Sequence, residues 1–192
     1  NVPSNRFMDE IQKISEKYDI HIISDEVQAG IGRTGKWWGV DNYSIEPDII
    51  SAAKPARIGA TISKEEIYPD KESRLSSTWG AGDVIAIAQG VATIKAIKEE
   101  NILNHVNKQG ENIYDRINDI KSEDIIDVRQ IGLMIGIEMD PKARKNQVIQ
   151  ECSEKGLLLM PCGKKTVRVL PPLDVTDREI DIFESIFTSC LK

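Results

Sequence analysis

The sequence has few cysteines and histidines, little aromatic character and no long hydrophobic run. Its 192 residues include 3 cysteines and 2 histidines, and the aromatic fraction is 5%. Cys152, Cys162 and Cys190 fit no zinc-ligand spacing, so we interpret them as reduced packing thiols of a cytoplasmic protein and expect no metal site. No apolar run is long enough to cross a bilayer, which excludes a membrane-spanning helix as the organising element.

The sequence also lacks an excess of positive charge. Its formal net charge is −6, and no stripe of lysine and arginine with interleaved aromatics occurs, so we expect no nucleic-acid partner. The hydrophobic fraction of 40% is enough for one globular domain or for parts of two. The chain opens on "NVPSNRF", with neither an initiator methionine nor a signal-like segment, and we interpret it as a piece of a longer polypeptide.

Helical and strand patterns alternate along the chain. Apolar residues at helical spacing from Phe7 to Tyr18 follow Ser4, a candidate N-cap, and "IHIIS" (20–24) predicts a short buried strand. Further strands are predicted at 48–53 and 59–63, and a long connecting helix at 83–101. The remainder predicts an α+β region, with helices at 102–120, 142–155 and after Thr176, and strands at 125–131, 133–139, 157–160 and 167–170.

A glycine motif follows the first predicted strand. Gly30, Gly32 and Gly35 have the G-x-G-x-x-G spacing of dinucleotide-binding loops. In those loops, however, the glycines directly follow a strand and open a helix. Here "DEVQA" intervenes and "KWWG" follows, so the pattern favours a turn over an NAD site.

Two polar residues at predicted strand ends are more informative. Asp25 lies at the end of the first strand and Lys54 just after the second. If these strands are neighbours, the two side chains face one crevice, because ligands of open α/β sheets bind beyond the carboxyl ends of the strands. A carboxylate and a lysine are the pair that pyridoxal phosphate requires, although a turn-capping Asp25 and a solvated Lys54 stay open on the residues alone.

Six ordered sequence blocks then identify a family resemblance. They are "SDEVQAGIGRTGKWWG" (24–39), "EPDII" with "AAK" (46–54), "RLSSTWGAG" (74–82), "DVRQIGLMIGIE" (127–138), "KGLLLM" (155–160) and "VRVLPPLDVT" (167–176). In this order they resemble class-III, fold-type-I aminotransferases over nearly the whole chain. The short segment after Lys54, "GKWWG" and "SRLSSTWG" are most similar to L-lysine 6-aminotransferases, whereas "GAGD" and "VRQIG" depart from them.

The resemblance implies roles for individual residues around pyridoxal 5'-phosphate. Lys54 would hold the cofactor as a Schiff base and shuttle the catalytic proton, while Asp25 would pair with the pyridinium nitrogen. Val27 would pack on a ring face and Gln28 would hydrogen-bond the phenolic oxygen. By strand alternation Asp25 and Val27 share one side, whereas Gln28 requires the chain to turn. An ordinary core role for Val27 stays open.

Further implied contacts concern the phosphate, the substrate and the partner subunit. Thr78 would reach the cofactor phosphate of a neighbouring subunit in a homodimer, with Ser76 and Ser77 as weaker candidates, although this run also suits a helix cap. Arg168 would grip a substrate carboxylate through two parallel hydrogen bonds, or be a solvated strand residue. Glu26 could receive a substrate amine or neutralise an arginine, and Trp37 and Trp38 could wall the entrance or serve packing.

The implied fold is the carboxyl-terminal part of the mainly parallel sheet of an α/β large domain (1–97), followed by an α+β small domain (98–192). The phosphate cup and the ring-stacking aromatic of such enzymes lie in an amino-terminal half that this sequence does not contain. The implied reaction moves an amino group, with L-lysine as the expected donor, to a 2-oxo acid such as 2-oxoglutarate. Ornithine, acetylornithine and 4-aminobutyrate aminotransferases, or a non-catalytic dimerising homologue, stay open as alternatives.

Overall fold

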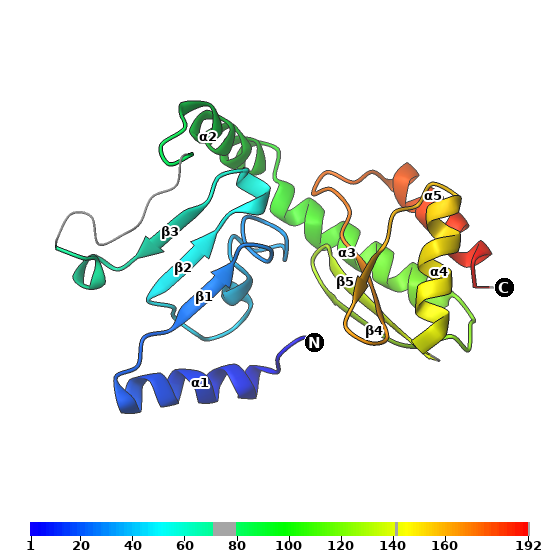
Figure 1. The fold of residues 1–192 in the computed structure, drawn as a ribbon, viewed down its shortest axis with the longest axis horizontal. Helices are drawn as coiled ribbons and strands as arrows, with labels where there is room; N and C mark the ends of the chain where they lie inside the picture. Colours follow the sequence, from blue (N-terminus) through cyan, green and yellow to red (C-terminus); the bar gives the residue numbers. More distant parts are fainter. Residues whose placement is uncertain (71–79, 141, 192) are drawn as a thin grey trace. The chain divides into compact units, whose positions relative to one another are not determined.

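The chain forms two compact units, each with its own sheet. A computed structural model describes residues 1–70, 80–140 and 142–191 (Figure 1). The first unit is Pro3–Asn101, and the second is Ile102–Lys192 together with Asn1–Val2. The chain passes from one to the other directly after Asn101, which has a left-handed backbone with φ of 54°. The domain limits of the full-length protein stay a prediction.

Helix α1 (Asn5–Tyr18) confirms the helix expected near the start. Ser4 is its N-cap and accepts a hydrogen bond from the Phe7 amide at 3.2 Å, and the helix ends at Asp19 in a left-handed conformation. Its apolar stripe is not buried within this unit, because Phe7 is 57% and Tyr18 61% exposed. The 3.6-residue periodicity therefore predicted the helix but not the burial of its apolar face.

A three-stranded sheet organises the first unit. Its strands are β1 (Ile23–Glu26), β2 (Ile49–Ala52) and β3 (Ala60–Ser63), in the order β1-β2-β3 (Figure 1). β1 and β2 are parallel, with Asp25 opposite Ser51, whereas β2 and β3 are antiparallel. The condition set for a shared crevice, that the first two strands are neighbours, is therefore met.

The prediction of a buried strand over 20–24 was partly wrong. The strand begins later, at Ile23, and Ile20 and Ile23 are 54% and 65% exposed. An apolar run shows that its side chains favour an apolar environment, but burial also needs an element that covers them. Among the described residues of this unit, nothing encloses these two side chains.

Asp48 joins the three strands at the end of the sheet where β1 and β2 begin. Its Oδ2 accepts a hydrogen bond from the Ile22 amide at 2.8 Å, and its Oδ1 lies 3.0 Å from Lys64 Nζ beyond β3. The His21 ring nitrogen is 3.7 Å from Oδ2. The Ile22 hydrogen bond and then Lys64 lower the pKa of this carboxyl group below its usual value.

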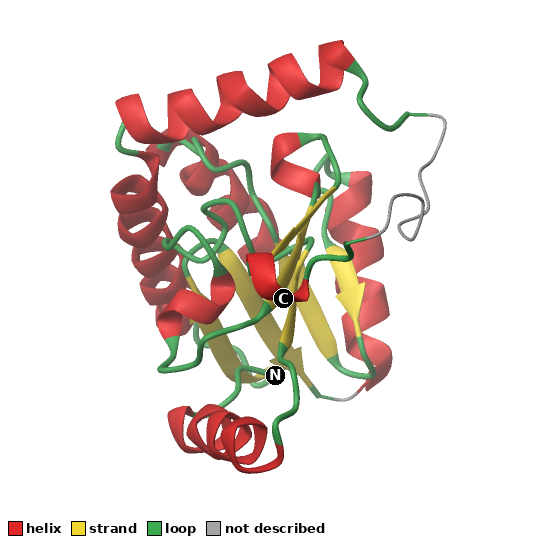
Figure 2. Cartoon of the chain, turned by 90° about the vertical axis from the view of Figure 1, so that its left-hand side faces the viewer, coloured by secondary structure: helices red, strands yellow, loops and turns green. Residues whose placement is uncertain are grey.

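Helix α2 (Val84–Glu99) closes the first unit. Asp83 caps it by accepting hydrogen bonds from the Ile85 and Ala86 amides at 2.8 and 3.0 Å. Gly90 packs against Ala56 and Ile58, because a Cβ atom there would lie 3.0 Å from the Ile58 side chain. Within this unit α1 and α2 lie at opposite ends (Figure 1 and Figure 2). The expected long helix is confirmed.

The second unit is an antiparallel sheet with three helices. Its elements are α3 (Ile102–Asp119), β4 (Ile125–Ile131), β5 (Met134–Met139), α4 (Lys142–Glu154), β6 (Met160–Cys162), β7 (Thr166–Val169) and α5 (Asp177–Ser189). The strand order is β4-β5-β7-β6, and every paired neighbour is antiparallel. The α+β architecture expected for this region is confirmed.

The core of the second unit lies between this sheet and its helices. Side chains alternate along β5, where Ile135, Ile137 and Met139 are buried and the residues between them are half-buried. Other fully buried side chains come from the helices and from β7: Val106, Ile113, Ile117, Val148, Val167, Ile180 and Phe187. Among the described residues, no helix combines the length and the apolar character that crossing a membrane requires.

The strand predicted at 157–160 was placed too early. Helix α4 ends at Glu154, and the Leu157 amide donates to the Cys152 carbonyl at 2.8 Å, which closes a turn directly after the helix. Leu159 is buried, whereas Leu158 is 83% exposed, and the ladder begins only at Met160. The chain therefore turns at Gly156 and Leu157 before it enters the sheet.

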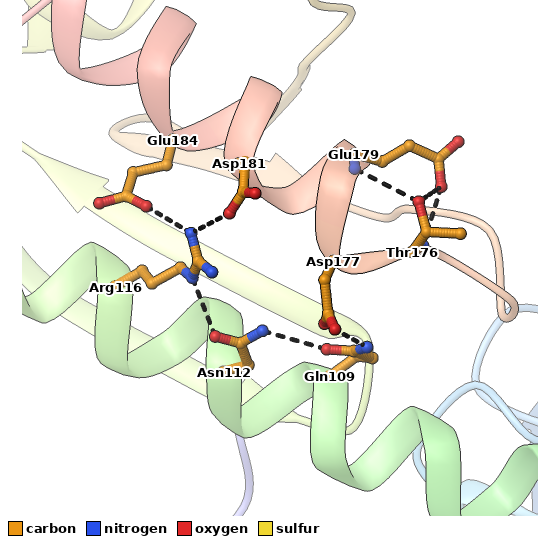
Figure 3. A network of polar contacts seen from close by, with 8 residues as sticks. All are labelled: Gln109, Asn112, Arg116, Thr176, Asp177, Glu179, Asp181 and Glu184. Carbon is orange, nitrogen blue, oxygen red and sulfur yellow. Dashed lines mark hydrogen bonds and ion pairs between the residues drawn. The ribbon is translucent and has the colours of Figure 1, made fainter.

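A polar network joins α3 to α5 on the surface of the second unit (Figure 3). Arg116 donates to Asp181 at 2.7 Å and Glu184 at 2.6 Å, and its Nε donates to Asn112 at 2.9 Å. Gln109 extends the network to Asp177 at 2.8 Å. The two carboxylates raise the pKa of Arg116, so the network stabilises its cationic form.

We expect Arg116→Met to destabilise the second unit by about 1 kcal/mol, because one arginine holds two carboxylates of another helix. The loss should shrink in 1 M salt, where the Debye length is only about 3 Å. Urea unfolding, monitored by circular dichroism at low and high salt, measures this loss in the free energy of unfolding. Lys108→Met, at an exposed position of the same helix, is the matched control; an equal loss there would contradict a specific role for Arg116.

We expect Asp48→Asn to destabilise the first unit at pH 7 and much less at pH 3. The native pKa of Asp48 is lowered, so its stabilising contribution is fully present above the unfolded value of about 3.9 and is lost as pH falls through the native value. The measurement is the urea midpoint of both proteins across this range. A constant difference between them at all pH values would rule out ionisation as the cause.

Candidate active site

The parallel pairing of β1 and β2 brings Asp25 and Lys54 to one edge of the sheet. Asp25 is the third residue of β1, and Lys54 opens a short 3₁₀ turn (Lys54–Ala56) two residues after β2 ends. Both residues are exposed. The carboxyl ends of parallel strands meet at the same edge, so a carboxylate and a primary amine flank the position where open α/β sheets bind ligands.

The Asp25 carboxylate is held in place by its neighbours. Its Oδ1 accepts a hydrogen bond from the Val27 amide at 3.1 Å and one from the Ser51 hydroxyl at 3.3 Å. Ser51 is the residue opposite Asp25 in the strand register. The two contacts fix the orientation of the carboxylate with groups from the turn after β1 and from β2. The sequence analysis did not anticipate the contribution of Ser51.

Val27 and Gln28 belong to a turn and not to the strand. β1 ends at Glu26, and the Gly30 amide donates to the Glu26 carbonyl at 3.0 Å, which closes a turn over residues 26–30. The argument that Val27 shares a side with Asp25 by strand alternation was therefore wrong, because alternation holds only in extended backbone. The turn that Gln28 requires is confirmed.

Glu26 is the buried acid of this segment. It is 1% exposed, and its carboxylate accepts hydrogen bonds from the Gly39 and Val40 amides, both at 2.8 Å, and from the Ser24 hydroxyl at 3.1 Å. Among the described residues its partners are therefore two backbone amides and a hydroxyl, and a contact with a substrate amine stays a prediction. A signal in the sequence was Gly39, where a Cβ atom would lie 2.8 Å from the Ala29 side chain and 3.0 Å from Glu26 Oε2.

The glycine motif forms turns. Gly32 and Gly35 have positive φ values of 91° and 77°, which glycine adopts without strain. Residues 27–38 form turns and bends, and only a short 3₁₀ helix (Gly39–Asn42) follows. A dinucleotide-binding loop opens an α-helix at this point, so the geometry contradicts the NAD interpretation.

Trp37 and Trp38 line an apolar cavity of the first unit. The cavity has a volume of about 440 Å³, and its walls include Ile58, Ile62 and Ile94. Lys98 Nζ lies 5.9 Å from the centre of the Trp37 ring. Neither Asp25 nor Lys54 is among the residues that line this cavity. These contacts place the two tryptophans in the wall of this cavity, and their role at the entrance of the site stays a prediction.

Arg168 lies in the second unit, in the middle of β7. Val167 and Val169 are 0% and 5% exposed, whereas Arg168 is half-buried and points to the other side of the strand. Its neighbours in the ladder are Gly136 of β5 and Met160 of β6. The expected alternation is confirmed, and the contact of Arg168 with substrate stays a prediction.

The remaining candidates concern the phosphate and metal ions. Ser76, Ser77 and Thr78 lie outside the described residues, so their roles stay predictions. Within 1–70, 80–140 and 142–191, no three or more histidine, cysteine, aspartate or glutamate side chains are grouped to hold a metal ion. The chemistry available at the described edge is therefore that of a carboxylate, a hydroxyl and an amine.

Comparisons with known proteins agree on one family. The model of the class-III aminotransferases matches residues 1–191. An acetylornithine aminotransferase of Archaeoglobus fulgidus is 36% identical over 185 residues, which cover 93% of this chain and 47% of that protein. One from Synechocystis is 35% identical over 179 residues, 88% of this chain and 42% of the relative.

Solved structures give the same result. A lysine aminotransferase of M. tuberculosis has a TM-score of 0.91 and 25% identity, over 97% of this chain and 45% of that one. An S-selective transaminase from Arthrobacter has a TM-score of 0.90 and 26% identity, over 100% of this chain and 48% of that one. The chain spans a little under half the length of the curated relatives it matches, and the expected fold-type-I architecture is confirmed. The chain belongs to the class-III aminotransferase family.

Proposed function

We propose that the full-length protein is a pyridoxal-phosphate-dependent aminotransferase that passes an amino group from an amino acid to a 2-oxo acid. The observation that carries this proposal is the placement of Asp25 and Lys54 at the shared carboxyl edge of two adjacent parallel strands. Membership of the class-III family supports it. A non-catalytic homologue would have no reason to keep both groups exposed at this edge.

The residues at the edge fit this cofactor. Its pyridine nitrogen needs a fixed anionic partner, and Asp25 is exposed and oriented by Ser51 and by the Val27 amide. Its aldehyde needs an accessible primary amine, which Lys54 supplies. When bound, pyridoxal phosphate withdraws electrons from the carbon that bears the amino group, which makes the proton on that carbon acidic.

Each candidate site residue of this chain then has a defined role. Lys54 Nζ would hold the cofactor in the resting enzyme and, once displaced, would carry the proton from the substrate carbon. Asp25 would keep a proton on the pyridine nitrogen. Val27 would pack against the ring and Gln28 would bind its phenolic oxygen. Thr78 would bind the phosphate group of the cofactor held by a neighbouring subunit, so a homodimer is part of this proposal.

The amine donor is the least determined part. L-lysine is our first candidate, supported by the similarity to the M. tuberculosis lysine aminotransferase, whereas the curated relatives are acetylornithine aminotransferases. Lysine and acetylornithine both carry a terminal amine and a carboxylate. Arg168 would bind that carboxylate and the carboxylate of the 2-oxo acid, because a guanidinium makes two parallel hydrogen bonds to it. A cytoplasmic location is also part of the proposal.

We expect borohydride reduction of the full-length protein loaded with pyridoxal phosphate to fix the cofactor on Lys54. Mass spectrometry of the peptides locates the label. Lys54→Ala should lose both the label and the transamination activity. Lys95→Ala, at an exposed lysine of α2, is the matched control and should keep both. A label on any other lysine would refute the assignment.

We expect Arg168→Lys to raise the KM for 2-oxoglutarate by at least about tenfold, which corresponds to 1.4 kcal/mol, since an ammonium lacks the two-pronged geometry. Steady-state kinetics measure the KM for 2-oxoglutarate. The same assay ranks the amine donors when it is run with L-lysine, L-ornithine, N-acetylornithine and 4-aminobutyrate. Arg178→Lys, at an exposed position of α5, should behave as wild type. An unchanged KM in Arg168→Lys would show that the acceptor carboxylate binds elsewhere.

A further inference from the structure

Glu26 stands out among the described side chains as a buried carboxylate that the proposed mechanism does not use. Its exposure is 1%, and it follows Asp25 directly on β1, with its side chain on the opposite face of the strand. A buried carboxylate is costly unless hydrogen bonds compensate its lost hydration. Here three donors do so: the amides of Gly39 and Val40 and the hydroxyl of Ser24.

Each of the two carboxylate oxygens of Glu26 accepts from a different backbone amide at the far end of the loop. Oε2 accepts from the Gly39 amide, and Oε1 accepts from the Val40 amide. The fit is close, because a Cβ atom at position 39 would lie 2.8 Å from the Ala29 side chain and 3.0 Å from Oε2. The loop from Gly30 to Gly39 is therefore closed at both ends on Glu26, whose carbonyl accepts from the Gly30 amide.

From these contacts we infer that Glu26 is a positioning residue for the cofactor-binding turn, an inference that rests on the proposed function. Val27 and Gln28 directly follow Glu26 and lie in the turn that the Gly30 amide closes on the Glu26 carbonyl, so fixing Glu26 fixes the start of this turn. The Val27 amide in turn donates to Asp25 Oδ1 at 3.1 Å. Glu26 thus orients the proposed partner of the pyridine nitrogen through Val27, without touching the cofactor itself.

The matched test is Glu26→Gln in the full-length protein. A glutamine has nearly the same shape but offers one acceptor oxygen and an NH₂ group, so it cannot accept from both the Gly39 and Val40 amides. Leaving one of these amides unpaired should loosen the loop. Glu46→Gln, at an exposed glutamate of the same unit, is the control.

Three readouts separate positioning from a general structural role. Hydrogen exchange measures the amides of Gly39 and Val40 without cofactor, and we expect Glu26→Gln to exchange them at least about tenfold faster, or 1.4 kcal/mol. We expect Glu26→Gln to bind pyridoxal phosphate with a dissociation constant about tenfold larger than that of wild type. The pH at which the visible absorption band of the bound cofactor titrates should also shift, because the orientation of Asp25 changes.

The outcomes distinguish this inference from the proposed function. If wild type binds no pyridoxal phosphate, both are wrong. If wild type binds it and Glu26→Gln matches wild type in affinity and titration, only the positioning role is wrong, even where exchange is faster. If Glu26→Gln does not fold, Ser24→Ala serves as the test, because it removes one hydrogen-bond donor to Oε1. It should shift all three readouts in the same direction as expected for Glu26→Gln. Three unchanged readouts would overturn the inference.

Discussion

The candidate site depends on the parallel pairing of β1 with β2. Parallel strands end at the same edge of a sheet, so Asp25 at the end of one strand and Lys54 just beyond the other reach a common position. In an antiparallel pair the two groups would lie at opposite ends. The same pairing puts Ser51 opposite Asp25, where its hydroxyl orients the carboxylate.

Register matters as much as direction. A slip of one residue would place Ile50 or Ala52 opposite Asp25 and remove the hydroxyl, since side chains alternate between the two faces of a strand. Asp48 opposes such a slip from the other end of the sheet, because it binds the Ile22 amide before β1 and the Lys64 amine after β3. The hydrogen bond from the Ile22 amide to Asp48, about one strand length away, therefore supports the register of β1 and β2 at the proposed site.

Local signals in the sequence predicted the elements well. Ser4 and Asp83 cap α1 and α2 as short polar side chains do, and the Asp25–Lys54 pair followed from two strand ends. Signals that need tertiary information failed: the exposure of Ile23 depends on what covers it, and the partners of Glu26 lie 13 and 14 residues away. Such long-range contacts leave no periodic pattern in the sequence.

Asp25 and Glu26 show how one strand end can serve two purposes. Consecutive residues of a strand point to opposite faces, so two adjacent acids need not compete for the same environment. Asp25 is exposed at the edge, whereas Glu26 is buried and accepts hydrogen bonds from the backbone amides of Gly39 and Val40. In the proposed function, the acidic pair would therefore couple the position of the carboxylate that pairs with the cofactor to the fold of the glycine-rich loop that follows it.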